Sequence, residues 1–259
     1  MSLLNKQKVR DFTRQDVWDL LTGEGTFRGI KVELRADMWN KWRKFVTSPS
    51  VINFSGYDFS EKKLQNFNLT GFRFRKAIFK KAYLRNAVFV GSDFKEANFN
   101  GAKIQGCDFR SANLDCANLS NTVISYSSFG KANLEQADLT KTTFEEVEFI
   151  EANLRHAYIN GSYFSDCNLE KTNLYSAQLL GTKFLKNNKL TGANLEDSYP
   201  GGGDFSGSNL SLIQFKSLAQ KIDVKVAPEL QKELEQTGNA VVYSKKPKSI
   251  WQKFLELFR

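Results

Sequence analysis

Residues 112–140 read ANLDCANLSNTVISYSSFGKANLEQADLT, and a large apolar residue returns at every fifth position of this stretch. This five-residue series of large apolar residues, here called the ladder, continues in both directions without interruption, from Phe54 to Phe184. All 27 of its positions hold Phe, Leu or Ile, and they take 13 of the 22 Phe residues in the chain. A period of five fits neither the 3.6 residues of a helix nor the two residues of a strand.

A second series lies two residues before each large one. From Ala77 to Thr182 these positions hold only Ala, Ser, Thr, Cys or Val. The two series together predict a coil with four short sides, in which each side turns one small and one large residue inward. Twenty residues then close one coil, and stacked coils share backbone hydrogen bonds at roughly 4.8 Å per layer.

The sequence offers a test of the twenty-residue register, because identical residues should then stack on one another. Residues of one kind do recur at that spacing, in three separate sets: Phe89, Phe109, Phe129 and Phe149; Leu114, Leu134, Leu154 and Leu174; Phe144, Phe164 and Phe184.

These residues resemble the pentapeptide-repeat family, whose motif is Ala-(Asp/Asn)-Leu-X-X, as in Ala112-Asn113-Leu114 and Ala132-Asn133-Leu134. The resemblance covers about residues 52–215. It implies an all-β solenoid, a right-handed quadrilateral parallel β-helix of about eight coils. The family serves many functions, so the fold does not by itself assign one here.

The pattern changes at three places. Bulky residues such as Tyr57 and Phe72 occupy the small positions of the first coil, which predicts an irregular or plugged start. The register slips by one near residues 187–189, and Pro200 with three following glycines predicts a loop at 199–204. We expect the β-helix to occupy residues 51–215.

The flanks have helical patterns. Residues 1–50 predict a helical cap, with one helix beginning near Thr13 and another over residues 35–45. Residues 216–259 predict a helix over 228–236 and a terminal amphipathic helix. The apolar face of that helix comprises Ile250, Trp251, Phe254, Leu255 and Phe258. Three roles stay open for the terminal helix: capping the solenoid, forming a homodimer, or binding a membrane surface through neighbouring lysines.

Residues that could carry chemistry are scarce. His156 is the only histidine, and its position predicts an exposed corner. Cys107 and Cys167 occupy inward positions about 14 Å apart, too far for a disulfide, while Cys116 faces outward. The sequence contains no phosphate-binding loop and no Ser-His-Asp set, so we expect no enzyme activity, no cofactor and no metal.

The formal charge of +9 is unevenly distributed. Residues 1–50 hold 10 basic and 6 acidic groups, residues 51–215 hold 18 and 17, and residues 216–259 hold 9 and 5. A nearly neutral repeat region argues against nucleic-acid binding by the coils themselves. The N-terminus has no secretory signal and no stretch resembles a membrane span, so the sequence predicts a cytoplasmic protein.

One side of the coil, centred on Leu84 through Phe184, carries outward residues typical of binding surfaces. The candidate interaction face comprises Tyr83, Arg85, Val123, Tyr126, Tyr163, Lys183 and Leu185. We expect it to contact a protein partner or the chain's own terminal helices; cover by a flanking helix is the alternative explanation of its composition.

The leading functional interpretation is a non-enzymatic protein-interaction or scaffold module. The family resemblance also implies a second possibility, because some members protect type II topoisomerases by imitating the acidic surface of DNA. Here the acids at 138, 145, 146, 148 and 151 predict a belt rather than a stripe, which weakens that reading. A membrane-associated scaffold anchored by the terminal helix is the third possibility.

Overall fold

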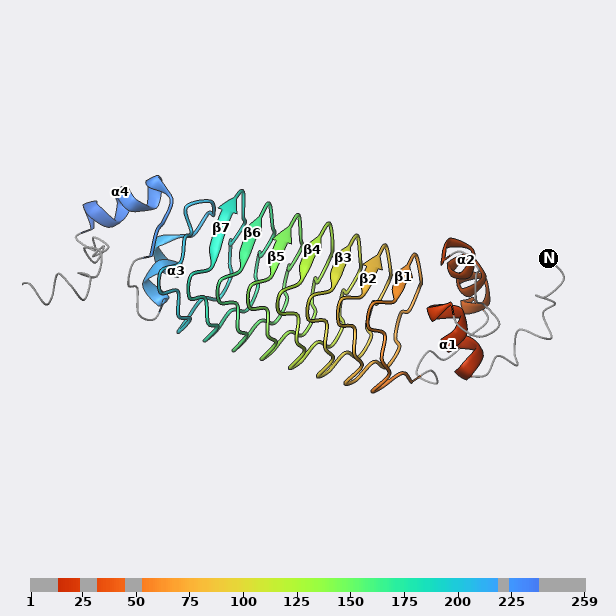
Figure 1. The fold of residues 1–259 in the computed structure, drawn as a ribbon. Helices are drawn as coiled ribbons and strands as arrows, with labels where there is room; N and C mark the ends of the chain where they lie inside the picture. Colours follow the sequence, from red (N-terminus) through yellow and green to blue (C-terminus); the bar gives the residue numbers. More distant parts are fainter. Residues whose placement is uncertain (1–13, 24–31, 45–52, 219–223, 238–259) are drawn as a thin grey trace, which may run out of the picture.

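The computed structural model describes residues 14–23, 32–44, 53–218 and 224–237 as a rod with helices at both ends (Figure 1). The helices α1 (Arg14–Thr22) and α2 (Val32–Arg43) lie at one end, and α3 (Leu212–Ser217) and α4 (Pro228–Gln236) at the other. Between them the chain forms the parallel β-solenoid that the five-residue period predicts. The helix predicted over 228–236 is confirmed as α4.

Seven short strands stack along one side of the rod in sequence order, and every pair is parallel. Each residue pairs with the residue twenty positions later, as Leu84 pairs with Ile104, up to the junction of β6 and β7. The strands are β1 (Lys63–Gln65), β2 (Tyr83–Arg85), β3 (Lys103–Gln105), β4 (Val123–Ser125), β5 (Thr143–Glu145), β6 (Tyr163–Ser165) and β7 (Lys183–Lys186).

The strand side is here called wall A, and the chain then turns through three more sides, walls B, C and D, before it returns to wall A. Walls B, C and D are held by single parallel bridges at the same spacing, for example Val88 with Asp108 on wall B. Asp93 pairs with Asn113 on wall C, and Asn98 with Asn118 on wall D. Four walls of five residues account for the twenty-residue register.

The large residues of the ladder fill the interior, and residues of the same type stack on one another in successive coils, as the sequence predicts. On wall B the Phe109 and Phe129 rings lie parallel with centroids 4.9 Å apart. On wall A the Phe144 and Phe164 centroids lie 4.6 Å apart. These separations match the rise of one coil, so each ring packs directly on the ring of the next layer.

The small residues are buried beside the large ones, and their hydroxyl groups are hydrogen-bonded. Thr142 Oγ1 donates to the carbonyl oxygen of Leu119 at 2.7 Å, and Ser162 Oγ donates to that of Leu139 at 2.6 Å. A buried hydroxyl without a partner would cost about 1–3 kcal/mol. Threonine and serine therefore substitute for alanine inside the coil without leaving an unpaired group.

The register slip lies in β7, which has four residues where the other strands have three. Phe164 pairs with Phe184, but Ser165 pairs with Lys186, so Leu185 is the extra residue. Beyond the slip, Asn188 fills a small inward position and is 2% exposed. Its Oδ1 accepts a hydrogen bond from the Cys167 amide at 3.1 Å, which joins the shifted coil to the one before it.

Residues 199–204 form an ordinary coil corner rather than the expected loop. Tyr199 bridges Gln178 on wall D, and Asp204 bridges Lys183 on wall A. Pro200 occupies the large inward position, and Gly203 the small one. A Cβ on Gly203 would lie 2.6 Å from the Pro200 carbonyl oxygen, so this corner requires a glycine there.

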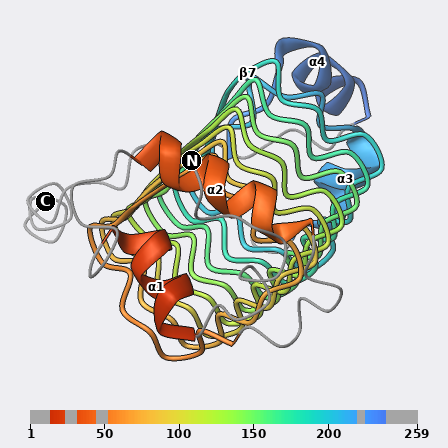
Figure 2. The same ribbon diagram turned by 90° about the vertical axis from the view of Figure 1, so that its right-hand side faces the viewer.

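The first coil has regular backbone pairing, and its bulky side chains meet the tryptophans of the N-terminal helices. Trp18 of α1 lies 5.1 Å from Tyr57 and 4.8 Å from Phe59, between ring centroids. Trp39 of α2 lies 5.6 Å from Phe72. The aromatic residues that looked too large for the coil therefore pack against α1 and α2. Figure 2 shows these two helices lying across the end of the coil.

The cap also satisfies the exposed backbone of the first coil. Trp39 Nε1 donates to the carbonyl oxygen of Asn68 at 2.6 Å. The Asn40 side chain donates to the Asn66 carbonyl at 2.8 Å and accepts from the Asn68 amide at 2.9 Å. An uncovered coil end would expose unpaired backbone groups to other chains.

Near the boundary at residue 215 that the sequence predicts, α3 takes the place of a wall segment, and beyond it Lys225 still bridges Asp204 on wall A. Ser211 begins α3 through a capping box with Gln214, and Phe215 is buried within that helix rather than on a wall. Gln214 Nε2 donates to the carbonyl oxygens of Leu190 and Ala193, the latter at 3.0 Å. The capping box explains the difference, because it fixes a helical turn where the five-residue pattern still continues.

Replacing Phe129 by Ala should lower the free energy of unfolding by about 3–5 kcal/mol, because its ring packs between two neighbours of the stack. Urea titration followed by circular dichroism measures the effect. The control Tyr163→Ala changes a half-exposed ring on wall A and should cost about 1 kcal/mol or less, through the loss of its contact with Lys183. Equal losses for the two variants would contradict the stacked-core description.

Candidate interaction surface

Wall A presents two columns of outward side chains, because successive residues of each strand alternate between core and solvent. Along strands β2 to β7, the first column holds Tyr83, Lys103, Val123, Thr143, Tyr163 and Lys183. The second holds Arg85, Gln105, Ser125, Glu145, Ser165 and, at the bulge, Leu185 with Lys186. Six of the seven residues predicted for the interaction face thus lie in these two columns.

The apolar members of the face are open to solvent. Val123 and Leu185 are each 50% exposed, Tyr83 is 42% and Tyr163 is 40% exposed. The four helices of the described residues lie at the ends of the rod, where α1 and α2 contact β1, and they leave the strands between the ends uncovered (Figure 1). Cover by α1–α4 therefore does not explain these side chains. The terminal helix with Ile250, Trp251, Phe254, Leu255 and Phe258 lies outside the described residues.

Two tyrosines of wall A are paired with lysines of the following coil. Lys103 Nζ lies 5.6 Å from the ring centroid of Tyr83, and Lys183 Nζ lies 5.4 Å from that of Tyr163. Cation–π contacts of this kind contribute about 0.5–1 kcal/mol at exposed sites. The wall therefore presents two aromatic rings that each lie next to a lysine ammonium group.

Tyr126, the seventh predicted residue, lies at the corner between walls A and B with a left-handed backbone (φ 51°). Glu146, and then Glu145, raise the pKa of its phenol because a phenolate would stand beside two carboxylates. The predicted face therefore has one tyrosine on an acidic edge and two tyrosines beside lysines.

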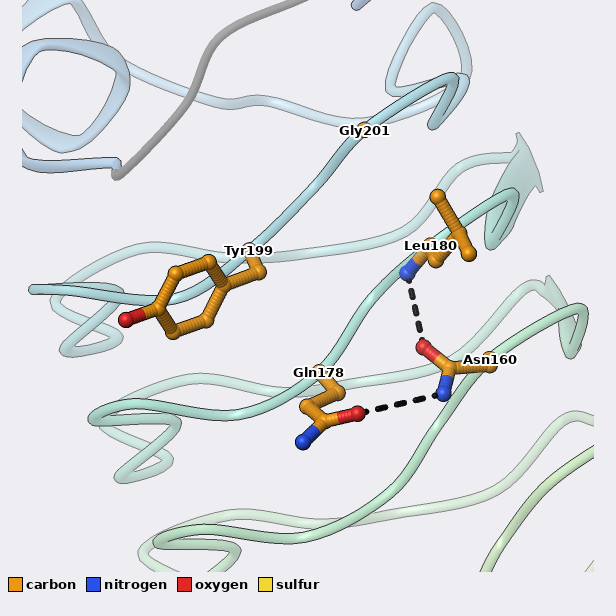
Figure 3. Close-up of a pocket in the computed structure, with 5 residues that line it drawn as sticks. All are labelled: Asn160, Gln178, Leu180, Tyr199 and Gly201. Atoms are coloured by element: carbon orange, nitrogen blue, oxygen red, sulfur yellow. Dashed lines mark hydrogen bonds between the residues drawn. The ribbon is translucent and has the colours of Figure 1, made fainter.

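Wall D carries a shallow hollow that the sequence analysis missed (Figure 3). It encloses about 300 Å³ and is lined by Asn160, Gln178, Leu180, Tyr199 and Gly201. Leu180 is 62% exposed, and a Cβ on Gly201 would lie 3.2 Å from its Cδ1. The signal in the sequence was the run of large residues in outward positions of wall D, which becomes visible only once the walls are assigned.

The hollow has an ordered polar edge. Asn160 Oδ1 accepts a hydrogen bond from the Leu180 amide at 2.9 Å, and Asn160 Nδ2 lies 3.5 Å from Gln178 Oε1 (Figure 3). Leu180 and Lys183 flank the corner between walls D and A, so the hollow and the C-terminal half of wall A share that corner.

Within the described residues, no group of three or more His, Cys, Asp and Glu side chains could hold a metal ion. His156 is partly exposed and accepts a hydrogen bond from Arg155 Nε at 3.1 Å. No helix in the described parts of the chain is long and apolar enough to cross a membrane.

The model of the family named Pentapeptide repeats matches the chain in eight copies, whose segments together span residues 52–184. The chain belongs to the pentapeptide-repeat family. Its walls A to D are the four faces of the family's right-handed β-helix. The resemblance inferred from the Ala-Asn-Leu motif and the fold that it implies are both confirmed.

Several solved structures are similar to this chain. A trypsin-treated form of QnrB1, a plasmid-mediated fluoroquinolone resistance protein, has 17% identity and a TM-score of 0.54, over 73% of this chain and 97% of its own. HetL, involved in heterocyst differentiation regulation in the cyanobacterium Nostoc sp. strain PCC 7120, has 22% identity and a TM-score of 0.39, over 68% and 81%. Among curated proteins no match was found. At these identities the likeness concerns the fold alone.

The three cysteines are free thiols in different surroundings. Burial raises the pKa of Cys107 to about 12 and that of Cys167 to about 11. Partial desolvation, and then the nearby Asp115 carboxylate, raise the pKa of the exposed Cys116 thiol.

With a disulfide reagent at about pH 8, only Cys116 should react before the protein unfolds, because thiolates are the reactive species. Because the pKa of the Cys116 thiol is raised, its reaction rate should still be increasing when the pH exceeds the usual pKa of a cysteine thiol. The variant Cys116→Ser, titrated in parallel, should show no reaction until denaturant is added. Rapid reaction in that variant would mean that the small inward positions open readily to solvent.

Proposed function

We propose that the chain is a non-enzymatic protein-interaction module that presents wall A to a protein partner. The observation that carries the proposal is an uncovered sheet face with exposed Tyr83, Val123, Tyr163 and Leu185. Large apolar side chains in such numbers on one wall favour contact with another protein. The tyrosines supply the residue type that dominates binding energy at many interfaces.

The β-helix suits this role because its surface is rigid before a partner arrives. Every strand of wall A is hydrogen-bonded to its neighbours, and the Phe144 and Phe164 rings fill the core behind it. A preorganised surface loses little conformational entropy on binding. The face thus functions as a scaffold on which side chains are held at fixed spacing, and catalysis is not part of the proposed function.

A second candidate function is that of a modulator or protector of a type II topoisomerase, favoured by the family membership and the fold shared with QnrB1. The acidic residues weigh against DNA mimicry. Glu145 and Glu146 lie at the edge between walls A and B, Glu148 on wall B, Glu151 at the next corner and Asp138 on wall D. They encircle the rod instead of following its length.

A supercoiling assay separates the two candidates. Purified protein should neither inhibit nor rescue DNA gyrase if wall A serves another partner. Rescue of gyrase from a quinolone, or inhibition of supercoiling at comparable concentrations, would favour the topoisomerase function. Homodimerisation and membrane anchoring through the terminal helix are two further proposals. Sedimentation of the protein alone tests homodimerisation, and sedimentation with liposomes tests membrane anchoring. Both experiments compare the full chain with a chain shortened before residue 249.

The double variant Tyr126→Ser/Tyr163→Ser should abolish capture of the partner from an extract of the native host, while thermal unfolding stays close to that of the parent. The reason is that both rings lie outside the core, at 53% and 40% exposure. Affinity capture followed by mass spectrometry makes the comparison. Unchanged capture by the double variant would remove wall A as the partner's site.

A further inference from the structure

The ion pairs of the solenoid are concentrated on one half of its circumference. Five lie on walls B and C or on corners of wall C, and a sixth joins Lys225 to Asp204 on wall A, in the coils that follow β7. The five are Arg75–Asp93, Lys76–Glu96, Lys95–Asp115, Arg110–Asp108 and Lys131–Glu151. On those walls most basic groups lie next to an acid of the same or the adjoining coil.

The corner between walls D and A is different. We define the basic strip as Lys80, Lys81, Lys103, Lys141 and Lys183, which lie at this corner or in the first column of wall A. All five are exposed, and the structure gives none of them an ion pair within the described residues. No Asp or Glu occurs in the six segments that form this edge: 80–83, 100–103, 120–123, 140–143, 160–163 and 180–183.

The fold holds these lysines along the rod. A Cβ on Gly101 would lie 3.5 Å from Lys81 Cγ, and one on Gly161 would lie 3.8 Å from Lys141 Cγ, so both lysine stems lie over a bare corner of the next coil. Lys103 and Lys183 are placed by their contacts with Tyr83 and Tyr163 described above. Glu145 and Glu146 lie across wall A from the strip. The acids nearest to the strip lie beyond its two ends: Glu61 at the same corner of the preceding coil, and Asp204, which bridges Lys183 and is paired with Lys225.

Three lysines of the strip recur at every second coil: Lys103, Lys141 and Lys183. Two coils rise about 10 Å, since neighbouring strands are roughly 4.8 Å apart. Seven residues of an α-helix rise about 10.5 Å. A helix lying along the strip would therefore place an acidic residue beside each of these lysines once per heptad.

Resting on the proposed interaction function, we propose that the partner segment of wall A is an acidic amphipathic α-helix that lies along the basic strip. Its acidic side chains face Lys103, Lys141 and Lys183. Its apolar side chains contact Val123 and Tyr163, which lie between these lysines. At the C-terminal end, a large apolar residue of the helix enters the hollow beside Leu180 and Tyr199, which adjoins Lys183 across the corner.

The same lysines fit a nucleic acid poorly. Duplex DNA carries a phosphate charge about every 1.7 Å of its axis, far denser than one lysine per two coils. Glu145 and Glu146 at the opposite edge of the wall would repel a second phosphate row. The apolar hollow and Val123 offer no partner to a sugar-phosphate backbone, whereas they suit the apolar face of a helix.

The test uses a fluorescein-labelled, alanine-rich peptide of 21 residues with Glu at positions 3, 10 and 17 and Leu beside them on the same face, long enough to form a helix in solution. Two comparison peptides replace Glu by Lys, or move the same Glu residues to the opposite face. Fluorescence anisotropy with the full chain should give binding to the first peptide alone, weakened by added salt.

The charge-reversal pair Lys103→Glu/Lys183→Glu should weaken binding of this peptide by about tenfold or more. The matched control Lys171→Glu/Lys189→Glu changes the net charge equally but lies on wall B and the corner after it, and should leave binding unchanged. Leu180→Ser should weaken binding several-fold, whereas Ile150→Ser, on wall B, should not.

Equal effects of the two charge-reversal pairs, or equal binding of the three peptides, would overturn the inference. Tighter binding of a 20-nucleotide oligothymidylate that depends on Lys103 and Lys183 would replace the acidic helix by a nucleic acid. The two proposals can also fail separately. If Tyr126→Ser/Tyr163→Ser abolishes capture of the host partner, wall A remains the proposed partner surface. If Lys103→Glu/Lys183→Glu then leaves both capture and peptide binding intact, only the proposal of an acidic helix is rejected.

Discussion

The structure depends on backbone pairing between residues twenty positions apart. Each coil must close in register with the coil before it, because the amide and carbonyl groups of its walls are satisfied by that neighbour. A closed four-sided coil leaves a narrow interior, which admits one large and one small side chain per wall. The five-residue ladder, the stacked phenylalanines and the buried hydroxyl groups follow from this single constraint. It also leaves little room for proline, of which the chain has four.

The same constraint explains the structure at the two ends of the solenoid and at its irregular coil. The first coil has no earlier coil to pair with, and its bulky Tyr57 and Phe72 meet Trp18 and Trp39 of the N-terminal helices instead. The last coil is closed by α3, with Gln214 bonded to carbonyl oxygens of the preceding coil. At the slip in β7 the chain absorbs one extra residue locally, so that pairing resumes at once. Solenoids need such closures because open ends expose both core and unpaired strands.

A rigid wall also explains how function can be separated from stability in this protein. The inward positions are restricted by the width of the coil, whereas the outward positions are free to vary. Ion pairs concentrate on walls B and C, and wall A and its corner with wall D keep lysines, tyrosines and apolar residues facing solvent. Since neither the core nor the backbone pairing requires these outward side chains, contact with a partner accounts best for their composition.

The sequence by itself determined the fold, the twenty-residue register, the buried positions and the two columns of wall A, because a five-residue period admits one coil geometry. It also located the extra residue near residues 187–189 to within a few positions. It failed where local chemistry competes with the repeat: the Ser211–Gln214 capping box begins a helix where the five-residue pattern continues, and Pro200 with Gly203 fits a corner instead of forming a loop. Only the tertiary structure decided which outward residues are neighbours. Leu180 and Tyr199 belong to successive coils and meet on one surface because the coils stack, so the hollow has no signature in any single segment of sequence.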